Sequence, residues 1–462
     1  MEKIRIVHTN DLHSHFESFP KLGRYLVQAQ KDPRFDQTLT FDAGDFMDRS
    51  HPLTEATNGQ INIDLMNSFH YDAVTIGNNE GVCNPHQVLA HLFDQANFDV
   101  VLADVFNEDG SQVKWAAPFK IIKTKKGTRI AVIGFTAAYP MTYNPNGWQV
   151  KKPVELLAGL LKKLAGRYDL LFLLTHIGIG QDRLLAKKFP QIDLIIGGHS
   201  HTLLPGGEKY GHTWIVQTGK WGRYIGDVTV KIADDHHLLS IAPKAVKTED
   251  LPEMPGDEEL IQDWWNHGYQ LLARQKVAFL PEKFADDTIA AVQVSLDAMA
   301  SFAKTDLALL NSGLFLAPFK QGLITRADLH RSLPHPMHVA RVRLKGRDLW
   351  RLVMEVEKNR HFLHKFPLRG MSFRGKIFGD IYYKGLKVNR QGHAVYVQGK
   401  KIVPDKTYTI AVLDHYILVP FFPTLAIVGN NTILAPQFLR GVVADYLAKK
   451  YPLPGKEAGR RG

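Results

Sequence analysis

Six short apolar runs in the first half of the chain, each ending in a small or polar turn, constrain the fold most. The runs are "KIRIVHTND" (3–11), "TLTFDAGD" (38–45), "DAVTIGNN" (72–79), "FDVVLADV" (98–105), "LLFLLTHI" (170–177) and "DLIIGGHSH" (193–201). Stretches with helical spacing, such as 154–168 and 182–189, lie between them. Strands that alternate with helices are typical of an α/β fold, which we therefore predict.

Residue types that bind metal ions follow five of these runs. They are Asp11 and His13 after the first run, Asp45 after the second, Asn78 after the third, His176 after the fifth, and His199 and His201 after the sixth. In α/β sheets the carboxyl ends of the strands share one edge, where ligands bind. The i, i+2 spacing within the first and last pairs predicts, for an extended backbone, that both side chains of a pair point the same way.

These seven candidate ligands carry both oxygen and nitrogen atoms, and they are too many for one tetrahedral ion. They suit two divalent ions bridged by a carboxylate, as in two-metal hydrolases that act on phosphoryl groups. Imidazole and carboxylate ligands without thiolate favour Mn, Fe, Zn or Co over Ca or Mg. A turn or a helix cap explains any one of these residues alone, but five strand ends in succession favour a metal site.

The character of the sequence changes near residues 233–257, where "ADDHHLL" and "LPEMPGDEE" indicate a boundary. We predict a metal-binding domain over 1–250, a connecting helix over 251–280 and a C-terminal substrate-binding domain over 281–462. A helical pattern at 286–303 opens the last domain.

Composition indicates the class of protein. Hydrophobic residues make up 45% and charged residues 22%, as in soluble globular proteins. Cys83 is the only cysteine, so no intramolecular disulfide can form. The start of the chain lacks the apolar stretch of a signal peptide, and the most apolar window, 416–428, is short and contains two prolines. We therefore expect a cytoplasmic protein without a membrane span.

The net charge of +11 raises the question of a nucleic-acid partner. The densest basic run, "KTKKGTR" (123–129), lies between two β-rich runs and reads as a hairpin turn. No nucleic-acid-binding motif accompanies it. A positive field that attracts small anionic substrates accounts for the charge, and we expect no nucleic-acid partner.

The motifs "HTNDLHSH", "FDAGDF", "IGNNE", "THIG" and "GGHSHT" resemble, in order, those of the 5′-nucleotidase family of metallophosphoesterases. The stretches "SLDAMASFAKTDLALLNSG", "LKGRDLWRLV" and "IVPDKTYTIAV" are similar to the C-terminal domain of that family. The resemblance implies an N-terminal sandwich of two sheets flanked by helices, followed by a C-terminal α/β domain. It also implies that Asp11, His13, Asp45 and His201 hold one ion and that Asp45, Asn78, His176 and His199 hold the other, with Asp45 as the bridge.

The chain departs from the family at two places. Asn79 replaces the histidine of the "GNHE" motif, and Val82 replaces the aspartate that orients this histidine in many relatives. In the C-terminal domain, "NSGLFL" (311–316) replaces "NGGGIR", so Leu316 stands where a phosphate-binding arginine is expected. Asn311 and Gly313 keep the turn and are the candidate substrate-binding residues. Leu368 and His415 fall near the positions of base-stacking phenylalanines.

These features together predict a two-domain, metal-dependent hydrolase of nucleotides or related phosphates, with Asn79 as its altered catalytic residue. The alternative is a nearly inactive nucleotide-binding protein that keeps the metals for recognition. The sequence leaves open which metals are bound, which substrate is used and which oligomeric state is formed.

Overall fold

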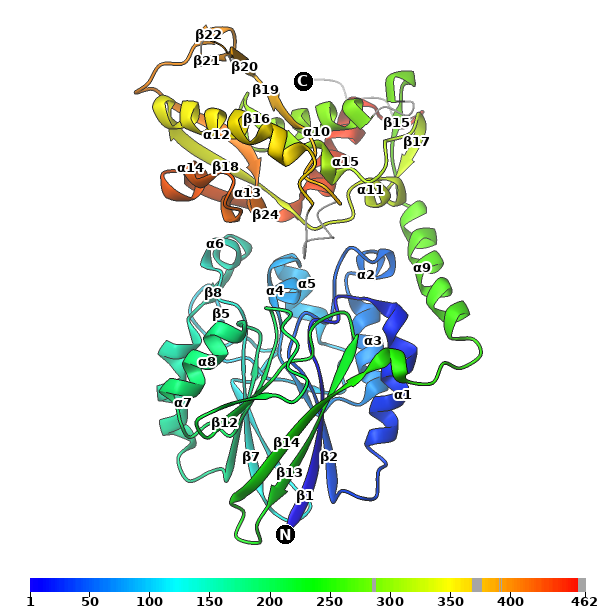
Figure 1. Ribbon diagram of the computed structural model, residues 1–462. Helices are drawn as coiled ribbons and strands as arrows, with labels where there is room; N and C mark the ends of the chain where they lie inside the picture. The colour runs from blue at the N-terminus through cyan, green and yellow to red at the C-terminus, as the bar shows by residue number, and fades with distance from the viewer. Residues whose placement is uncertain (285–287, 368–375, 390, 392, 456–462) are drawn as a thin grey trace. The chain divides into compact units, whose positions relative to one another are not determined.

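The computed structural model describes residues 1–284, 288–367, 376–389, 391 and 393–455 (Figure 1). The chain divides into two compact units, Met1–Gly268 and Tyr269–Gly462. The stretch predicted as a connecting helix contains helix α9 (Asp257–Ala273) and strand β15 (Lys276–Leu280). The functional division into 1–250, 251–280 and 281–462 stays a prediction.

Two six-stranded sheets form the first unit. In spatial order, the first sheet holds β14 (Leu238–Lys247), β13 (Tyr224–Ile232), β1 (Glu2–Thr9), β2 (Gln37–Asp42), β3 (Ala73–Val74) and β4 (Asp99–Val100). The second holds β11 (Glu208–Tyr210), β12 (Thr213–Val216), β10 (Leu194–Gly197), β9 (Leu170–Thr175), β7 (Arg129–Phe135) and β6 (Phe119–Lys123). Strands β5 (Val105–Asn107) and β8 (Trp148–Val150) form a separate pair. The predicted hairpin at 123–129 is confirmed, because β6 and β7 pair antiparallel with Lys123 opposite Arg129.

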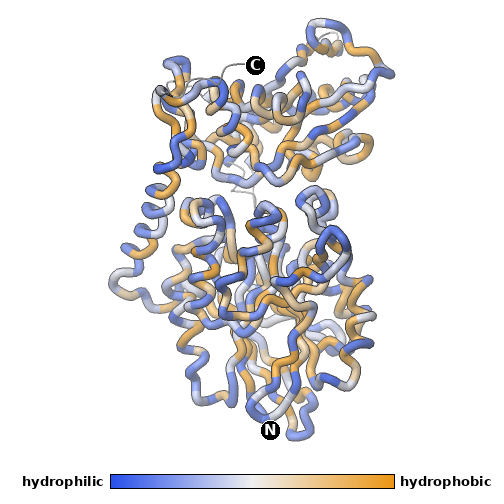
Figure 2. Tube along the Cα trace, turned by 180° about the vertical axis from the view of Figure 1, so that it is seen from behind, coloured by the Kyte–Doolittle hydropathy of each residue, from blue (hydrophilic) through white to orange (hydrophobic). Residues whose placement is uncertain are grey.

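The two sheets share one hydrophobic core. Ile6 and Phe41 of the first sheet and Phe172 and Ile196 of the second belong to the same cluster and are fully buried. Figure 2 shows hydrophobic segments running through the interior of this unit. Near-continuous apolar runs form these strands because both faces of each sheet are covered.

Helices cover the outer faces of the sandwich, as predicted. In Figure 1, α1 and α3 flank the first sheet, and α7 and α8 flank the second. The helices of this unit are α1 (Phe19–Ala29), α2 (Pro52–Ala56), α3 (Gln60–Phe69), α4 (Asn78–Val82), α5 (His86–Leu92), α6 (Pro140–Tyr143), α7 (Pro153–Leu164) and α8 (Ile179–Lys188).

Parallel pairing brings the predicted site residues to one edge of each sheet. β1 runs parallel to β2, with Thr9 opposite Asp42, and β2 runs parallel to β3. In the second sheet β9 runs parallel to β10, with Thr175 opposite Gly197. The loops after these five strands therefore leave the two sheets at corresponding edges, which positions their polar side chains for a shared site.

The second unit is built on a five-stranded sheet with the order β19 (Ile381–Lys384), β16 (Ala308–Asn311), β23 (Thr407–Leu413), β18 (His338–Lys345) and β24 (Asn430–Phe438). β15 pairs with β17 (Gly322–Thr325), and β20 (Leu386–Asn389), β21 (Ala394–Val397) and β22 (Lys400–Lys401) form a third sheet. Its helices are α10 (Thr288–Phe302), α11 (Arg326–Ser332), α12 (Gly346–His364), α13 (Asp414–Leu418), α14 (Pro423–Ile427) and α15 (Leu439–Lys450). The unit is therefore the α/β domain that was predicted.

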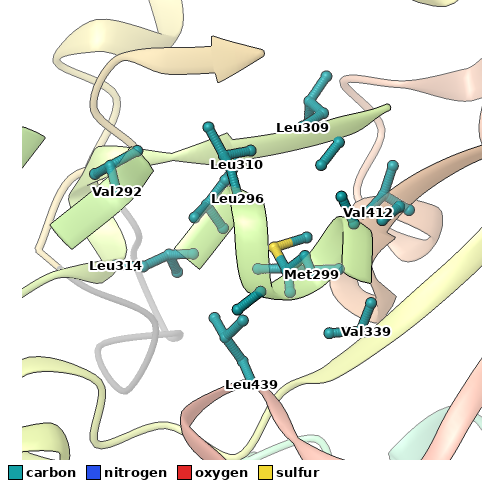
Figure 3. Packing of buried hydrophobic residues seen from close by; sticks show 14 of the residues in the cluster. Val292, Leu296, Met299, Leu309, Leu310, Leu314, Val339, Val412 and Leu439 are labelled. Atoms are coloured by element: carbon teal, nitrogen blue, oxygen red, sulfur yellow. The ribbon is translucent and has the colours of Figure 1, made fainter. Parts of the chain in front are cut away.

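One hydrophobic core holds the second unit together. Figure 3 shows Leu296 and Met299 of α10 packed with Leu310 of β16, Val412 of β23 and Leu439 of α15. Across the described ranges of the chain, none of the helices has both the length and the apolar character that crossing a lipid bilayer requires.

Candidate metal centre

The structure brings the seven predicted ligands of the first unit together. Two groups of potential ligand atoms, each within 4.8 Å of one another, are formed by Asp11, His13 and His201, and by Asp11, Asp45 and His176. His13 Nε2 lies 3.1 Å from His201 Nε2. Side chains from loops after β1, β2, β9 and β10 thus meet at one place.

Two buried carboxylates lie between the imidazoles. Asp11 Oδ1 is 3.3 Å from His201 Nε2, 3.6 Å from His13 Nε2 and 3.8 Å from His176 Nε2. Asp45 Oδ2 is 3.2 Å from His176 Nε2 and 3.8 Å from His13 Nε2. Both carboxylates therefore lie close to imidazoles on two sides. The sequence pattern alone does not distinguish which of the two would bridge a pair of metal ions.

His176 has the orientation of a metal ligand. Its Nδ1 donates a hydrogen bond to the carbonyl oxygen of Ala43 at 2.8 Å, which fixes the ring. Its Nε2 is buried and forms no hydrogen bond with any described residue, although it faces the two carboxylates. A backbone carbonyl that holds one ring nitrogen while the other stays available is the usual arrangement around a bound metal ion, so these residues fit a divalent cation.

His199 and Asn78 face each other at the same site, and a tyrosine holds the outer side of the imidazole. His199 Nδ1 lies 2.8 Å from Asn78 Oδ1. The other ring nitrogen, Nε2, lies 2.7 Å from the hydroxyl of Tyr139. Because a hydroxyl both donates and accepts, Tyr139 keeps Nδ1 directed at Asn78 in either tautomer of the ring.

The backbone at the site corrects one prediction. Asp11 and His13 have φ values of 51° each, and His199 and His201 have 76° and 53°, so neither pair lies in extended backbone. Asp45 is also left-handed, with φ of 54°. The pairs come together because tight left-handed turns follow the strands. Such conformations are unfavourable for residues other than glycine and are concentrated at functional sites.

Close approach of the loops depends on glycine. Gly77 lies so near Asp45 that a Cβ atom there would be 2.0 Å from Asp45 Oδ1. The buried carboxylate of Glu80 accepts hydrogen bonds from the backbone N–H groups of Asp45, Met47 and Gly77. Glu80 therefore ties the loop after β2 to the loop after β3.

Opposite charges compensate one another at the site. Burial raises the pKa of Asp11, but His176 and the other imidazoles more than reverse this and hold it well below its ordinary value. Burial lowers the pKa of His176, and the carboxylates of Asp45 and Asp11 reverse this and raise it to about 10. Burial, together with the charge of His176, lowers the pKa of His199 to about 4. The Asp11 carboxylate is therefore held in its charged form, which is the form that binds a divalent cation.

Asn79 lies beside this cluster and contacts His13. Its amide nitrogen is 2.8 Å from His13 Nδ1, 3.1 Å from the carbonyl oxygen of Met47 and 3.3 Å from Asp48 Oδ2. Its backbone N–H donates to Asp45 Oδ1 at 2.7 Å. In this arrangement the Asn79 amide orients His13, and its catalytic role stays a prediction.

The candidate substrate residues of the second unit have a structural role. Asn311 is fully buried; its side-chain amide donates to the carbonyl oxygen of Phe378, and the Tyr416 hydroxyl donates to its amide oxygen. A Cβ atom on Gly313 would lie 2.0 Å from the carbonyl oxygen of Ile377, so only glycine fits. Substrate binding by Asn311 and Gly313 stays a prediction. Of the two positions near the expected phenylalanines, His415 is buried, and Leu368 lies outside the described residues.

Sequence reasoning missed Tyr139 and Asp48. Asp48 is buried, with Oδ2 3.6 Å from His13 Nδ1. Its only sequence signal is a position three residues after Asp45, in the same polar loop. Tyr139 follows β7, which runs parallel to β9 in the second sheet. Its position after a strand that ends at the shared edge could have identified it from the sequence.

Replacing Tyr139 with phenylalanine tests its hold on His199. We expect the affinity for Mn²⁺ to fall about tenfold, the lower end of the effect of residues that orient ligands. The measurement is calorimetric titration of metal-stripped protein, with Tyr210→Phe, a partly exposed tyrosine of β11, as the matched control. Equal affinities for Tyr139→Phe and wild type would show that the hydroxyl does not position the ring.

Comparisons with known proteins give matches in both units of the chain. Residues 4–203 match the calcineurin-like phosphoesterase family, and residues 279–418 match the 5′-nucleotidase C-terminal domain. An uncharacterized metallophosphoesterase of Bacillus subtilis (strain 168), YunD, is 34% identical over 97% of this chain and 100% of its own length. A 5′-nucleotidase of Vibrio cholerae is 25% identical over 75% of this chain and 74% of its own. The solved structure of a 5′-nucleotidase precursor from Thermus thermophilus has a TM-score of 0.59 at 20% identity and covers 99% of this chain and 98% of its own.

Proposed function

The chain belongs to the 5′-nucleotidase family of metallophosphoesterases and is a phosphoester hydrolase, and from this premise we propose that it prefers nucleotide substrates whose leaving group needs little protonation. Two substrate types meet this condition. One is a phosphoric anhydride, which releases a phosphate, and the other is a 2′,3′-cyclic phosphate, which releases a strained ribose oxygen. A plain 5′-monophosphate releases a poor alkoxide.

One observation carries the hydrolytic part of the proposal. The Nε2 atom of His176 is buried, free of hydrogen bonds to described residues and directed at the carboxylates of Asp45 and Asp11. We propose that Asp11, His13, Asp45, Asn78, His176, His199 and His201 hold two divalent cations. When bound, such cations activate water and polarise the phosphoryl oxygens. The nucleotide-binding alternative has no support in this arrangement.

The chemistry of Asn79 carries the preference for substrates. Its amide donates hydrogen bonds but carries no proton that it could transfer to a leaving oxygen. General acid assistance is typically worth about 10²–10⁴ in rate, so its loss affects alkoxide leaving groups most. The side chain instead holds His13 and contacts Asp48.

Hydrolysis of a substrate panel tests the proposal. We expect the Mn²⁺-loaded full chain to hydrolyse ADP and 2′,3′-cyclic AMP with a higher kcat/KM than AMP, as measured by release of product. Chelation of the metal with EDTA should abolish all three activities. A higher kcat/KM for AMP than for ADP and 2′,3′-cyclic AMP would contradict the leaving-group argument. If the protein hydrolyses none of the three nucleotides and does not hydrolyse p-nitrophenyl phosphate either, the proposed nucleotide hydrolysis itself is contradicted.

A further inference from the structure

A basic loop that the metal centre does not use lies directly beside it. Lys220, Trp221 and Arg223 follow β12, which runs parallel to β10, the strand that leads to His199 and His201. We call residues 220–223 the basic loop. Because parallel strands share one edge, the basic loop leaves the sheet at the edge that carries the metal centre.

Hydrogen bonds fasten the basic loop, and Gly219 directly before it, to the candidate ligands and their neighbours. The backbone N–H of Trp221 donates to the carbonyl oxygen of Asp11 at 2.7 Å. The N–H of Gly219 donates to the carbonyl oxygen of Thr202, the residue after His201, at 2.9 Å. Asn10 joins the two sides, because its amide nitrogen donates to Gly219 O at 2.9 Å and to Asp11 Oδ2 at 2.7 Å.

The basic loop is held in a strained conformation. Trp221 has a φ of 65°, which is rare for a large side chain. Its carbonyl oxygen accepts a hydrogen bond from Ser18 Oγ at 2.8 Å, and the following residue, Gly222, also has a positive φ. Backbone strain of this kind persists only where surrounding contacts enforce it, and it is concentrated at ligand-binding segments.

Cations gather on the Trp221 ring. Lys220 Nζ lies 4.0 Å from the ring centroid, and the guanidinium carbon of Arg223 lies 4.7 Å from it. His15 stacks on the same ring with a centroid distance of 4.5 Å. Because three groups already pack on the indole of Trp221, we expect a ligand to interact with the positive charges of the loop and not to stack on the ring.

Neither Lys220 nor Arg223 forms a close ion pair with a residue of the described ranges, but the exposed Arg223 lines a cavity that also holds the carboxylates of Glu17, Glu249 and Glu253. Lys220 is half-buried. Its pKa is lowered by burial and by Arg223 and is raised in part by Asp11, so its amine lies within electrostatic reach of a candidate metal ligand. Two neighbouring cations beside a phosphoryl-transfer site, neither of them in a close ion pair with a described residue, suit an anion.

We propose that Lys220 and Arg223, packed on Trp221, form a second anion subsite that binds the phosphoryl group next to the one that is hydrolysed. The inference rests on the proposed function and names its substrate class as nucleotides with a phosphoric anhydride. It agrees with the chemistry of Asn79, because the group bound by the basic loop would be the leaving phosphate. The same cations would stabilise the charge that this group gains as the bridging P–O bond breaks.

Binding of a diphosphate analogue tests the subsite without catalysis. The probe is ADP with a methylene group in place of the bridging oxygen, compared with AMP, by calorimetry on the Mn²⁺-loaded full chain. We expect Lys220→Ala and Arg223→Ala each to reduce the preference for the diphosphate analogue over AMP about tenfold, the loss expected for one charge-assisted contact. Lys220→Arg should retain the preference.

Lys209→Ala is the matched control, because Lys209 also lies over a tryptophan of this unit, 5.9 Å from the Trp214 ring, but on β11. It should retain the wild-type preference. If Lys220→Ala weakens binding of the diphosphate analogue and of AMP equally, the loop acts only through its general electrostatic field. If it weakens binding of neither, the loop does not contact either nucleotide. Either result overturns the subsite.

Turnover of p-nitrophenyl phosphate by the same preparations separates this test from the proposed function. An inactive protein that still shows the expected loss of preference contradicts the proposed function and supports the subsite. An active protein whose preference is the same in all variants overturns the subsite and leaves hydrolysis standing.

Discussion

Asp45→Ala is expected to lose most of the bound metal and to lower turnover at least about 10³-fold, because several kcal/mol of charge stabilisation depend on the cations. Asp45 Oδ2 lies 3.2 Å from His176 and 3.8 Å from His13, so it serves both sides of the cluster. Metal analysis of protein purified without chelator gives the occupancy, for which we expect up to two ions in wild type.

A second variant is needed because Asp45 also supports the backbone. Its Oδ1 accepts the N–H of Asn79 at 2.7 Å, where helix α4 begins. Asp45→Asn keeps an acceptor there and removes the charge, so it should fold and still lose metal. Asp11→Ala distinguishes the role of Asp11 from that of Asp45. If Asp45 bridges, Asp11→Ala should retain one ion, whereas Asp45→Ala should lose most of both. Full occupancy in Asp45→Ala would contradict the two-metal assignment.

The sequence predicted that the candidate metal ligands meet at one place because each follows a buried strand, and strands of this kind can be recognised from their apolar runs. The parallel pairing of β1 with β2 and of β9 with β10 then places the residues after these strands at a common edge. The apolar runs by themselves predicted only an α/β fold, and the sandwich of two sheets was implied by the resemblance to the family.

The details of the site were not predictable, because they depend on loop conformation. The left-handed φ values of Asp11 and His13 set the directions of their side chains, and no periodicity encodes them. The contact between Tyr139 and His199 joins two loops that are 60 residues apart. Asp48 lies in the loop after β2, three residues after the left-handed Asp45, and approaches His13 from there. Residues that support ligands from irregular loops thus carry little local signal.

The second large effect is expected for Asn79→His, which restores an acid for the leaving group. An imidazole Nδ1 at the place of the asparagine amide nitrogen would lie 2.8 Å from His13 Nδ1, 3.1 Å from the carbonyl oxygen of Met47 and 3.3 Å from Asp48 Oδ2. Asp48 would therefore orient the new ring, which is the role that the family resemblance implies for an aspartate at position 82. The ring's Nε2 would then be free to donate a proton to the ribose 5′-oxygen of AMP.

We expect Asn79→His to raise kcat/KM for AMP by up to about 10²-fold, at the low end of general acid effects because the site is not shaped for this ring. The gain for ADP should be smaller, since a departing phosphate needs little protonation. Adding Asp48→Asn should remove most of the gain, whereas adding Val82→Asp should add little if Asp48 already orients the ring. Metal content must be measured for each variant, because Asn79 and Asp48 both contact His13. If kcat/KM rises equally for AMP and ADP at unchanged metal content, Asn79 does not govern the choice of leaving group. If the gain persists in the double variant with Asp48→Asn, Asp48 does not orient the introduced histidine.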